Sequence, residues 1–508
     1  MNKLLLVMAV CITVGSTVES AEARVKENLG AIINSKHDDR LPIISPDGRT
    51  LYFIRMGSPE NSDRDIESTD IWYSEKDAKG RWTKAKNIGK PLNNDAPNAV
   101  LSAGMDNNSL LLLSTYNSDG STKGNGISYS YRTKDGWAVP EEVVIDYFYN
   151  KHPEYSGYCL SQDWYYLIAS VERDDSLGDT DLYVSFKVSD KKYSRPKNLG
   201  RTLNTSGKER TPFLAADNKT LYFSSDRPGG RGDMDIYVTR RLDNTWTNWS
   251  APENLGPEFN TDGWDGYFSI PASGSQAYLV SSTGSLGMRD IFRIAMPDVI
   301  KPLPVVLVQG VVQNKKSGEP VDALIQYYDL TNGVLIGSAI ADPANGRYSI
   351  ILQSGKRYAF RAEKKDFYAV NENLDVSVLT EYTEIEQDLM LVPIESGQTV
   401  RMNNIFFEYN KSDLHPESKE ELNRVVALLR NNSTMKLEIA GHTDNVGGEA
   451  YNRSLSQARA AAVARYFVSA GIQSGRLTAK GYGQSKPVVA NTSDAGRKQN
   501  RRVEFVIQ

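Results

Sequence analysis

The sequence predicts a multidomain protein with two all-β regions followed by one α/β domain. Three observations lead to this fold class: a repeat of about 55 residues up to residue 297, a second strand-rich stretch beyond it, and strands that alternate with helices from residue 401. A chain of 508 residues also has room for roughly three to four domains. We expect a five-bladed β-propeller over 24–297, a small all-β sandwich over 305–393 and an α/β domain over 401–508, joined by linkers at 298–304 and 394–400.

An internal repeat indicates the blades of the propeller. Its clearest pattern is an Asp or Gly followed by an aliphatic residue and a strand, at steps of 54 to 56 residues, and it begins at Asp70, Gly126, Asp181, Asp235 and Asp290. A turn that contains Asp or Gly precedes each pattern, and an Asn-Ile-Gly or Asn-Leu-Gly motif follows three of them. Each unit therefore has four short strands, which is typical of a propeller blade.

The two ends of the repeat region are expected to meet. The fifth repeat lacks its last strand after Ile294, whereas Asn28-Leu29-Gly30 near the N-terminus matches the motif of that strand. We expect the N-terminal segment to supply the outer strand of the last blade and so to remove the open edge. These repeats resemble the TolB-type, WD-repeat-like propellers of exported bacterial proteins. The turn aspartates, such as Asp47 and Asp217, are expected to bond to their own turn backbone and not to a metal.

The composition argues against several classes of function. Lys and Arg number 59 against 63 Asp and Glu, a net charge of -4, which differs from the strongly basic character of nucleic-acid-binding proteins. Only Cys11 and Cys159 are present, so no cysteine-based zinc site can form. The sequence contains no zinc-protease, nucleophile-elbow or phosphate-loop motif. We expect no enzyme activity, no cofactor, no metal and no nucleic-acid partner.

The N-terminus predicts export. Lys3 precedes eleven apolar residues, Leu4–Val14, and Ala21-Glu22-Ala23 is a small-x-small cleavage site. Residues 1–23 have the features of a secretory signal peptide that is cleaved after its last residue. A lipoprotein signal that uses Cys11 is the alternative, although the residue before it is not small. No later stretch approaches the roughly 18 uncharged apolar residues of a membrane-spanning helix.

The middle segment begins after a stretch that contains three prolines. Val305–Val312 is dense in β-branched residues, Ser317–Val321 has turn composition, and Ala323–Tyr328 is a further strand pattern. About seven short strands in some 90 residues indicate a small sandwich. The pattern resembles the carboxypeptidase regulatory-like, transthyretin-like module, and no catalytic residues are evident in it.

From residue 401 the sequence predicts two helices on a mixed sheet. The expected elements are the strand Ile405–Tyr409, an amphipathic helix around Leu422–Leu429, the strand Leu437–Ile439, the helix Leu455–Ala470 and the strand Arg502–Ile507. Residues 398–508 carry a net charge of +6, which suits an acidic ligand, and a solvated basic face is the alternative.

Four motifs give this domain a specific resemblance. They are Gly441-His442-Thr443-Asp444-Asn445-x-Gly447, Asn452-x-x-Leu455-Ser456-x-x-Arg459-Ala460, Gly481-Tyr482-Gly483 and Gly496-Arg497-x-x-Asn500-Arg501-Arg502-Val503. The sequence here resembles the C-terminal peptidoglycan-binding domain of the OmpA family over about 105 residues. The resemblance implies that the domain holds the diaminopimelate of peptidoglycan stem peptides, with Asp444 and Arg459 as the contacts.

The chemistry of diaminopimelate suits this pair. Its side chain ends in an ammonium and a carboxylate, so Asp444 can accept from the first and the planar guanidinium of Arg459 can bind the second. We expect Arg459 in the first turns of its helix, near free backbone N–H groups. The alternative is that Asp444 and Arg459 merely pair with each other. The further expected contacts are Thr443, Asn445, Asn452, Leu455 and Arg501, and His442 is expected to be structural.

These features predict a non-catalytic protein of the periplasm that is associated with the outer membrane and the cell wall. The C-terminal domain holds peptidoglycan, and the propeller binds an outer-membrane or periplasmic protein and so tethers it to the wall. The architecture resembles envelope proteins of the Bacteroidetes type, some of which anchor a secretion or gliding machine. The alternative is a scaffold or sensor of such a machine that acts mainly through protein–protein contacts. An enzyme built on the propeller is disfavoured because the repeats show no catalytic set.

Overall fold

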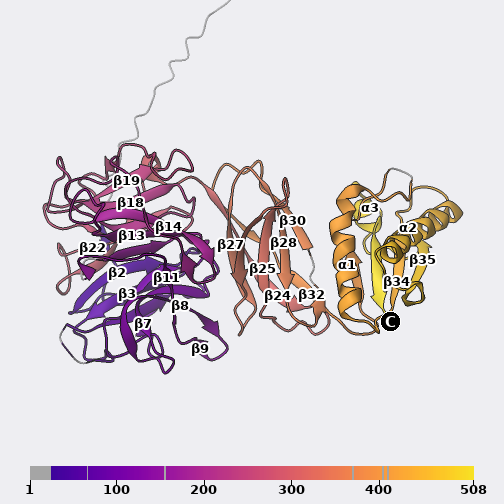
Figure 1. Ribbon diagram of the computed structural model, residues 1–508, viewed down its shortest axis with the longest axis horizontal. Coiled ribbons are helices and arrows are strands. Elements are labelled where there is room, and N and C mark those ends of the chain that lie inside the picture. The colour runs from indigo at the N-terminus through magenta and orange to yellow at the C-terminus, as the bar shows by residue number, and fades with distance from the viewer. Residues whose placement is uncertain are drawn as a thin grey trace, which may run out of the picture.

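The computed structural model describes residues 25–508, except residues 64, 66, 154, 155, 369, 370, 403, 404, 409 and 410. The expected signal peptide, residues 1–23, and Cys11 lie outside the described residues. The chain is mostly β-structure, with few helices, and it forms three parts that follow one another along the long axis (Figure 1). In this described portion, no helix is both long and apolar enough to cross a membrane.

The N-terminal part contains five sheets, which we call the sheet ring (residues 25–296). The first strands of the five sheets contact one another in the cyclic order β2, β6, β12, β17, β21 and again β2. The first sheet has β2 (Asp38–Ile44), β3 (Thr50–Met56), β4 (Thr69–Glu75) and β5 (Lys86–Asn87), and the second has β6 (Val100–Ala103), β7 (Ser109–Tyr116), β8 (Thr122–Thr133), β9 (Gly136–Trp137) and β10 (Glu141–Glu142).

The other three sheets repeat the same antiparallel order, except that one short strand, β11, runs parallel to its neighbour β15. The third sheet has β12 (Gly157–Leu160), β13 (Tyr166–Val171), β14 (Asp181–Ser189), β15 (Lys192–Tyr193), β16 (Lys197–Asn198) and β11 (Val144–Ile145). The fourth has β17 (Glu209–Leu214), β18 (Thr220–Ser225), β19 (Asp235–Arg240) and β20 (Glu253–Asn254), and the fifth has β21 (Gly266–Ser269), β22 (Gln276–Ser281), β23 (Asp290–Ala295) and β1 (Glu27–Asn28).

The N-terminal strand belongs to the last sheet. β1 pairs antiparallel with β23, with Glu27 opposite Arg293 and Asn28 opposite Phe292. The guanidinium of Arg293 donates to both carboxylate oxygens of Glu27, at 2.7 and 2.8 Å. The expected pairing of the N-terminal segment with the fifth repeat is therefore confirmed.

In four of the five sheets, the repeated residues connect strands through hydrogen bonds between buried or half-buried side chains. In the first sheet, Asn87 Nδ2 donates to the carboxylate of Asp70 at 2.7 Å, and Asn93 Nδ2 donates to Asn87 Oδ1 at 2.8 Å. The Asn93 amide also bonds to both the N–H and the C=O of Ile71, at 2.8 and 3.0 Å. We call this set an Asp-Asn-Asn network. It recurs at Asp181-Asn198-Asn204, Asp235-Asn254-Asn260 and Asp290-Asn28-Asn34. The second sheet has Gly126 at the position of the aspartate.

The turns between the first two strands of the sheets are fixed by their own aspartates. Asp47 accepts from the N–H of Arg49 at 3.0 Å, and Asp217 accepts from the N–H of Lys219 at 2.9 Å. The predicted turn role of these aspartates is confirmed, because a side chain that bonds two residues ahead closes a turn.

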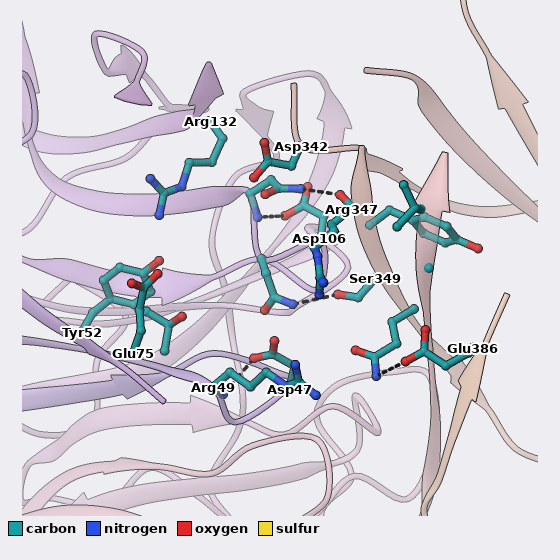
Figure 2. A pocket seen from close by; sticks show the side chains of 17 residues that line it. Asp47, Arg49, Tyr52, Glu75, Asp106, Arg132, Asp342, Arg347, Ser349 and Glu386 are labelled. Atoms are coloured by element: carbon teal, nitrogen blue, oxygen red, sulfur yellow. Dashed lines mark hydrogen bonds between the residues drawn. The ribbon is translucent and has the colours of Figure 1, made fainter. Parts of the chain in front are cut away.

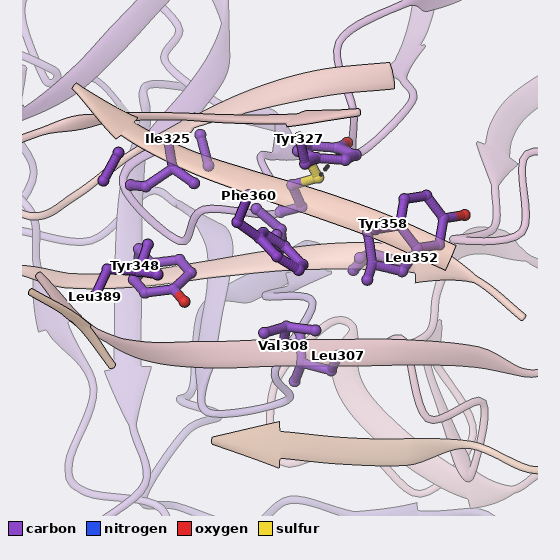
Figure 3. Close-up of a cluster of buried hydrophobic side chains, with 14 of the residues drawn as sticks. Leu307, Val308, Ile325, Tyr327, Tyr348, Leu352, Tyr358, Phe360 and Leu389 are labelled. Carbon is purple, nitrogen blue, oxygen red and sulfur yellow. Dashed lines mark hydrogen bonds between the residues drawn. The ribbon is translucent and has the colours of Figure 1, made fainter. Parts of the chain in front are cut away.

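The central part consists of two sheets that share one core. One sheet has the order β27-β24-β32-β29 with β31 beside β24, and the other has the order β26-β25-β28-β30. Side chains from both sheets, such as Val308, Ile325 and Phe360, are buried between them (Figure 3). The strands are β24 (Val305–Asn314), β25 (Leu324–Asp329), β26 (Leu335–Ile340), β27 (Arg347–Gln353), β28 (Arg357–Glu363), β29 (Phe367–Tyr368), β30 (Asn371–Asp375), β31 (Thr383–Glu386) and β32 (Leu389–Pro393).

The central part covers one end of the sheet ring. Met105, Ala216 and Ala272, which follow the ends of β6, β17 and β21, are buried in the same apolar cluster as the central core. The amide of Asn108 donates across the junction to the carbonyls of Ile340 and Arg347, at 2.9 and 3.3 Å. Beside these contacts lies a polar cavity of about 420 Å³, in which acidic and basic side chains from both parts alternate (Figure 2).

The C-terminal part is an α/β layer, as predicted. Its sheet has the order β33-β36-β34-β35, in which only β34 and β35 are parallel, and α1 and α2 share one buried core with it. The elements are β33 (Thr399–Met402), α1 (Lys419–Asn431), β34 (Leu437–His442), α2 (Glu449–Ser469), β35 (Leu477–Gly483), α3 (Asp494–Asn500) and β36 (Val503–Ile507), with short 3-10 turns at Asp298–Ile300, Pro416–Ser418 and Ser474–Arg476.

One expected strand and the expected start of one helix in this part were wrong. The strand predicted at Ile405–Tyr409 does not form over residues 405–408, where only Phe407 makes an isolated bridge, to Leu414. The second helix begins at Glu449, not at Leu455. In addition, β33 covers residues on both sides of the expected boundary between residues 400 and 401.

The central and C-terminal parts also share buried contacts. Tyr368 of β29 and Val392 of β32 belong to the C-terminal core, and the Tyr368 ring meets Phe505 edge-on at 5.1 Å. The Tyr368 hydroxyl donates to the carboxylate of Glu421 on α1 at 2.9 Å. Burial next to this carboxylate raises the pKa of Tyr368 well above its ordinary value.

Candidate functional site

The loop that follows β34 carries the first sequence-predicted site residues. β34 ends at His442, and the chain then turns through Asp444, whose Oδ1 accepts from the N–H of Val446 at 3.0 Å. Gly447 has a φ of +97°, a conformation that a side chain disfavours, and it lets the loop enter α2. The backbone of Thr443 is bonded to the end of β35, because its N–H donates to the carbonyl of Gly483 at 3.0 Å.

Asn452 fastens this loop to the helix. Its Nδ2 donates to the carbonyl of Val446 at 3.1 Å and to Gln484 Oε1 at 3.1 Å, with longer contacts to the carbonyls of Asp444 and Gly447. The side chain is 2% exposed. Asn452 therefore acts as a positioning residue for the loop that presents Asp444.

The loop, α2, α3 and the segment after β33 enclose a cavity of about 570 Å³. Six of the seven residues predicted for the site line this cavity, and Asn445 is exposed outside it. The lining has six cationic side chains and two carboxylates, which makes it strongly positive. The cations are Arg401, Arg459, Arg497, Lys498, Arg501 and Arg502, and the carboxylates are Glu408 and Asp444.

Asp444 is paired with Arg501. The Asp444 side chain is 9% exposed, and its Oδ2 accepts from Arg501 Nη1 at 2.6 Å. The expected alternative, an ion pair between Asp444 and Arg459, is not what this carboxylate makes here. Arg501 is 48% exposed, so a ligand ammonium can compete for Asp444 at low cost.

Arg459 also lines the cavity, and it lies over an aromatic ring. Its guanidinium carbon is 5.0 Å from the centre of the Phe407 ring, and its Nε donates to the carbonyl of Lys411 at 3.1 Å. Burial lowers the pKa of Arg459 from its ordinary value, and the positive charge of Arg501 acts in the same direction. A negative ligand group therefore gains from both arginines.

The expected place of Arg459 at the start of its helix was wrong. Because α2 begins at Glu449, Arg459 lies in the body of the helix, where backbone N–H groups are bonded within the helix. Gly448 caps the helix without a side-chain hydrogen bond, and the free N–H groups lie beside Glu449. The free N–H groups at the start of α2 therefore lie next to the Asp444 loop and not next to Arg459.

Two buried polar side chains of the cavity lining, Thr443 and His442, adjoin the Asp444 loop. Thr443 is 4% exposed, and its Oγ1 has no hydrogen-bond partner among the described residues. His442 stacks on Tyr482 with ring centres 5.3 Å apart, and its Nε2 lies 3.3 Å from Glu504. Burial raises the pKa of Glu504, but the contact with His442 and the ion pair with Arg502 outweigh it and lower this pKa to about 2.

Several lining residues were missed by the sequence reasoning. Arg497 stands inside one of the quoted motifs and Phe407 inside the expected strand Ile405–Tyr409, but nothing in these patterns distinguished their roles from those of neighbours. Tyr451 and Arg401 carried no local signal, since each reaches the cavity only through the packing of α2 and β33 on the sheet.

Comparison with known proteins identifies a family for this part of the chain. Residues 406–501 match the profile of the OmpA family. The C-terminal part of this chain is an OmpA family domain. Outer membrane porin F of Pseudomonas fluorescens is 39% identical over 113 residues, which are 22% of this chain and 35% of that protein. Outer-membrane lipoprotein YfiB of Pseudomonas aeruginosa is 38% identical over 105 residues, 21% of this chain and 62% of that protein.

A solved structure is also similar to part of this chain. It is described as the cell wall anchor of the T6SS from Pseudomonas aeruginosa, and it is 34% identical to this chain, with a TM-score of 0.20. The match covers 22% of this chain and 78% of that chain. This chain spans less than two thirds of the length of the curated relatives named above.

Proposed function

We propose that this protein is a non-catalytic component of the cell envelope that binds peptidoglycan through its OmpA family domain. The observation that carries the proposal is the convergence of Asp444, Arg459 and Arg501 on one strongly positive cavity in that domain. A diaminopimelate side chain brings an ammonium to Asp444 and a carboxylate to Arg459, while Thr443 Oγ1 offers a further hydrogen bond. The names of the two curated relatives refer to the outer membrane, which supports a place in the envelope.

The sheet ring has a different role in this proposal. We interpret its five sheets, with their cyclic contacts and the closing pair of β1 and β23, as a five-bladed propeller, and the central part as a carboxypeptidase regulatory-like sandwich. The propeller binds an outer-membrane or periplasmic protein, and the wall domain tethers that protein to peptidoglycan. Many weak wall contacts per cell act together, so modest affinity at each site suffices.

The test is sedimentation of the purified protein with insoluble peptidoglycan. Wild type is compared with Asp444→Ala, Arg459→Ala and Arg465→Ala, the last of which removes an exposed arginine of the same helix outside the cavity. Wild type and Arg465→Ala should pellet, and the two site variants should bind at least tenfold more weakly, because each loses a charge-assisted hydrogen bond of about 1.5–3 kcal/mol.

The second candidate is a scaffold or sensor of an envelope secretion or gliding machine. It is favoured if folded wild-type protein stays in the supernatant, because the OmpA family domain then acts through protein contacts. Helix signal near 222 nm, which comes from α1, α2 and α3 in the described part of the chain, verifies that each variant is folded before binding is compared.

A further inference from the structure

A third cavity lies at the centre of the sheet ring. Its volume is about 410 Å³, and it is lined by the first strands of the sheets, including Leu41 of β2, Gly157 of β12 and Tyr267 of β21. The first strands run from this cavity toward the turns that the central part covers. The cavity therefore opens on the face of the ring that points away from the wall-binding domain.

Three of the first strands carry an unusual backbone at this cavity. In each of them, the pairing with the second strand is interrupted by a register shift. At this shift a non-glycine residue adopts a positive φ: Leu41 at 52°, Thr211 at 45° and Tyr267 at 53°. For a β-branched residue such as Thr211 this conformation is costly. Bulges in strands re-aim side chains, and strained residues concentrate where a ligand is held.

The lining combines an apolar body with a positive rim. Tyr158, Phe213, Trp264, Tyr267 and Phe268 bring aromatic rings, and the charged residues among the described lining are Arg210 and Arg289. Arg289 donates two hydrogen bonds to Asp38, at 2.9 and 2.7 Å, and Arg210 lies 3.7 Å from Asp179; neither of these carboxylates is part of the described lining. Such a cavity fits a ligand with an aromatic or aliphatic group next to an anion.

We propose that this cavity binds the C-terminal end of a partner polypeptide, with the terminal carboxylate at Arg210 and an apolar last side chain among the rings. Two features select a chain end. The cavity has room for a few residues only, and the central part covers the opposite end of the ring, so that a chain entering the cavity ends there. The two arginines select a carboxylate rather than an N-terminal ammonium. This inference rests on the proposed function in one respect, that the ring carries the partner.

The test is calorimetric titration of the full protein with the acetylated peptide Gly-Ser-Gly-Phe. The free-acid peptide should bind, and the same peptide with an amidated C-terminus should bind at least tenfold more weakly. Replacing the last Phe by Gly should also weaken binding at least tenfold. Equal affinity for the acid and the amide, or no binding of either peptide, would overturn the proposal.

Variants locate the site on the ring. Arg210→Gln and Tyr267→Ala should each weaken binding of the free acid at least tenfold, whereas Arg81→Gln, at a side chain 71% exposed outside the cavity, should not. Asp444→Ala should bind the peptide like wild type, so that failure of this proposal and failure of wall binding are separate results. The comparison of acid and amide on wild type needs no variant and stands even if Tyr267→Ala does not fold.

Discussion

The sheet ring and the OmpA family domain both bury polar side chains, but they use them differently. In the ring, Asn204 is 1% exposed, and its amide bonds to the N–H and C=O of Leu182 and to Asn198. In the OmpA family domain, Thr443 is 4% exposed, and its hydroxyl faces a cavity without a partner among the described residues. Buried polar groups normally find partners. A network that recurs from sheet to sheet thus maintains the fold, whereas an unrepeated cluster with an unpaired atom is suited to a ligand.

The largest effect is expected from the ring network. Asn204→Ala leaves the buried Leu182 N–H unsatisfied, at about 1–3 kcal/mol, and removes one hydrogen bond each from the Leu182 C=O and Asn198 Oδ1, at about 0.5–1.5 kcal/mol each. The last two groups each keep another backbone N–H donor, so the ring should lose roughly 3–5 kcal/mol in all. All seven tryptophans lie between residues 72 and 264, so urea unfolding followed by tryptophan fluorescence reports on the ring alone. Asn244→Ala, an exposed asparagine of the same region, is the control and should change stability by less than about 0.5 kcal/mol. A similar loss of stability in both variants would show that the buried network contributes no more to the fold than an exposed asparagine does.

The next effect concerns acid stability of the OmpA family domain. The pKa of Glu504 is lowered from 4.5 to about 2, so its contribution is fully present above pH 4.5 and is lost as the pH falls toward 2. The shift corresponds to roughly 3 kcal/mol. Glu504→Gln should therefore be less stable than wild type at neutral pH, and the difference should vanish near pH 2. Unfolding followed at 222 nm measures it, because the described α-helices all lie in this domain. A difference that is independent of pH would contradict the assignment.

The third prediction tests whether the buried Asn452 supports ligand binding more than it supports the stability of the fold. Asn452→Ala frees the loop that carries Asp444, and it should weaken peptidoglycan binding about tenfold while costing only roughly 1–2 kcal/mol of stability. The measurements are sedimentation with peptidoglycan and unfolding at 222 nm. Asn204→Ala, which is in the ring, should leave wall binding unchanged under conditions where it is folded. Unaltered binding by Asn452→Ala would make this residue purely structural.

The smallest effect is expected at the junction of the central part with the OmpA family domain. Tyr368→Phe removes the hydrogen bond to Glu421 and should lower stability by about 1 kcal/mol. The matched control is Tyr466→Phe, which removes a solvent-exposed hydrogen bond to Asn423 and should have almost no effect. Both are measured at 222 nm. Equal effects would show that burial at the junction adds nothing.

The sequence predicted regular features better than long-range ones. The spacing of Asp70 and its equivalents repeats, so the sheets and the closing strand could be recognised from the chain alone, and the Asp444 and Arg459 motifs lie at one common cavity. The start of α2 was misplaced because its apolar spacing is evident only from Leu455, whereas a glycine cap and Glu449 begin it.

Two further features lay beyond local patterns. The ion pair of Asp444 with Arg501 joins residues 57 positions apart, and no spacing rule connects them. The strand expected at Ile405–Tyr409 was predicted from its apolar residues, but the Phe407 ring packs beneath Arg459 instead of pairing along a sheet. In both cases the tertiary structure decided the outcome.

The pairing of β1 with β23 imposes an order of events on folding. Glu27 meets Arg293, a partner 266 positions later, so an emerging chain cannot join these strands until nearly the whole ring has been synthesised. Until then the edge of β23 and the groups that bond Asn28 and Asn34 stay exposed to other chains, which is a hazard for aggregation. Because contacts so distant in sequence form slowly, closure of the ring sets the pace at which this protein matures.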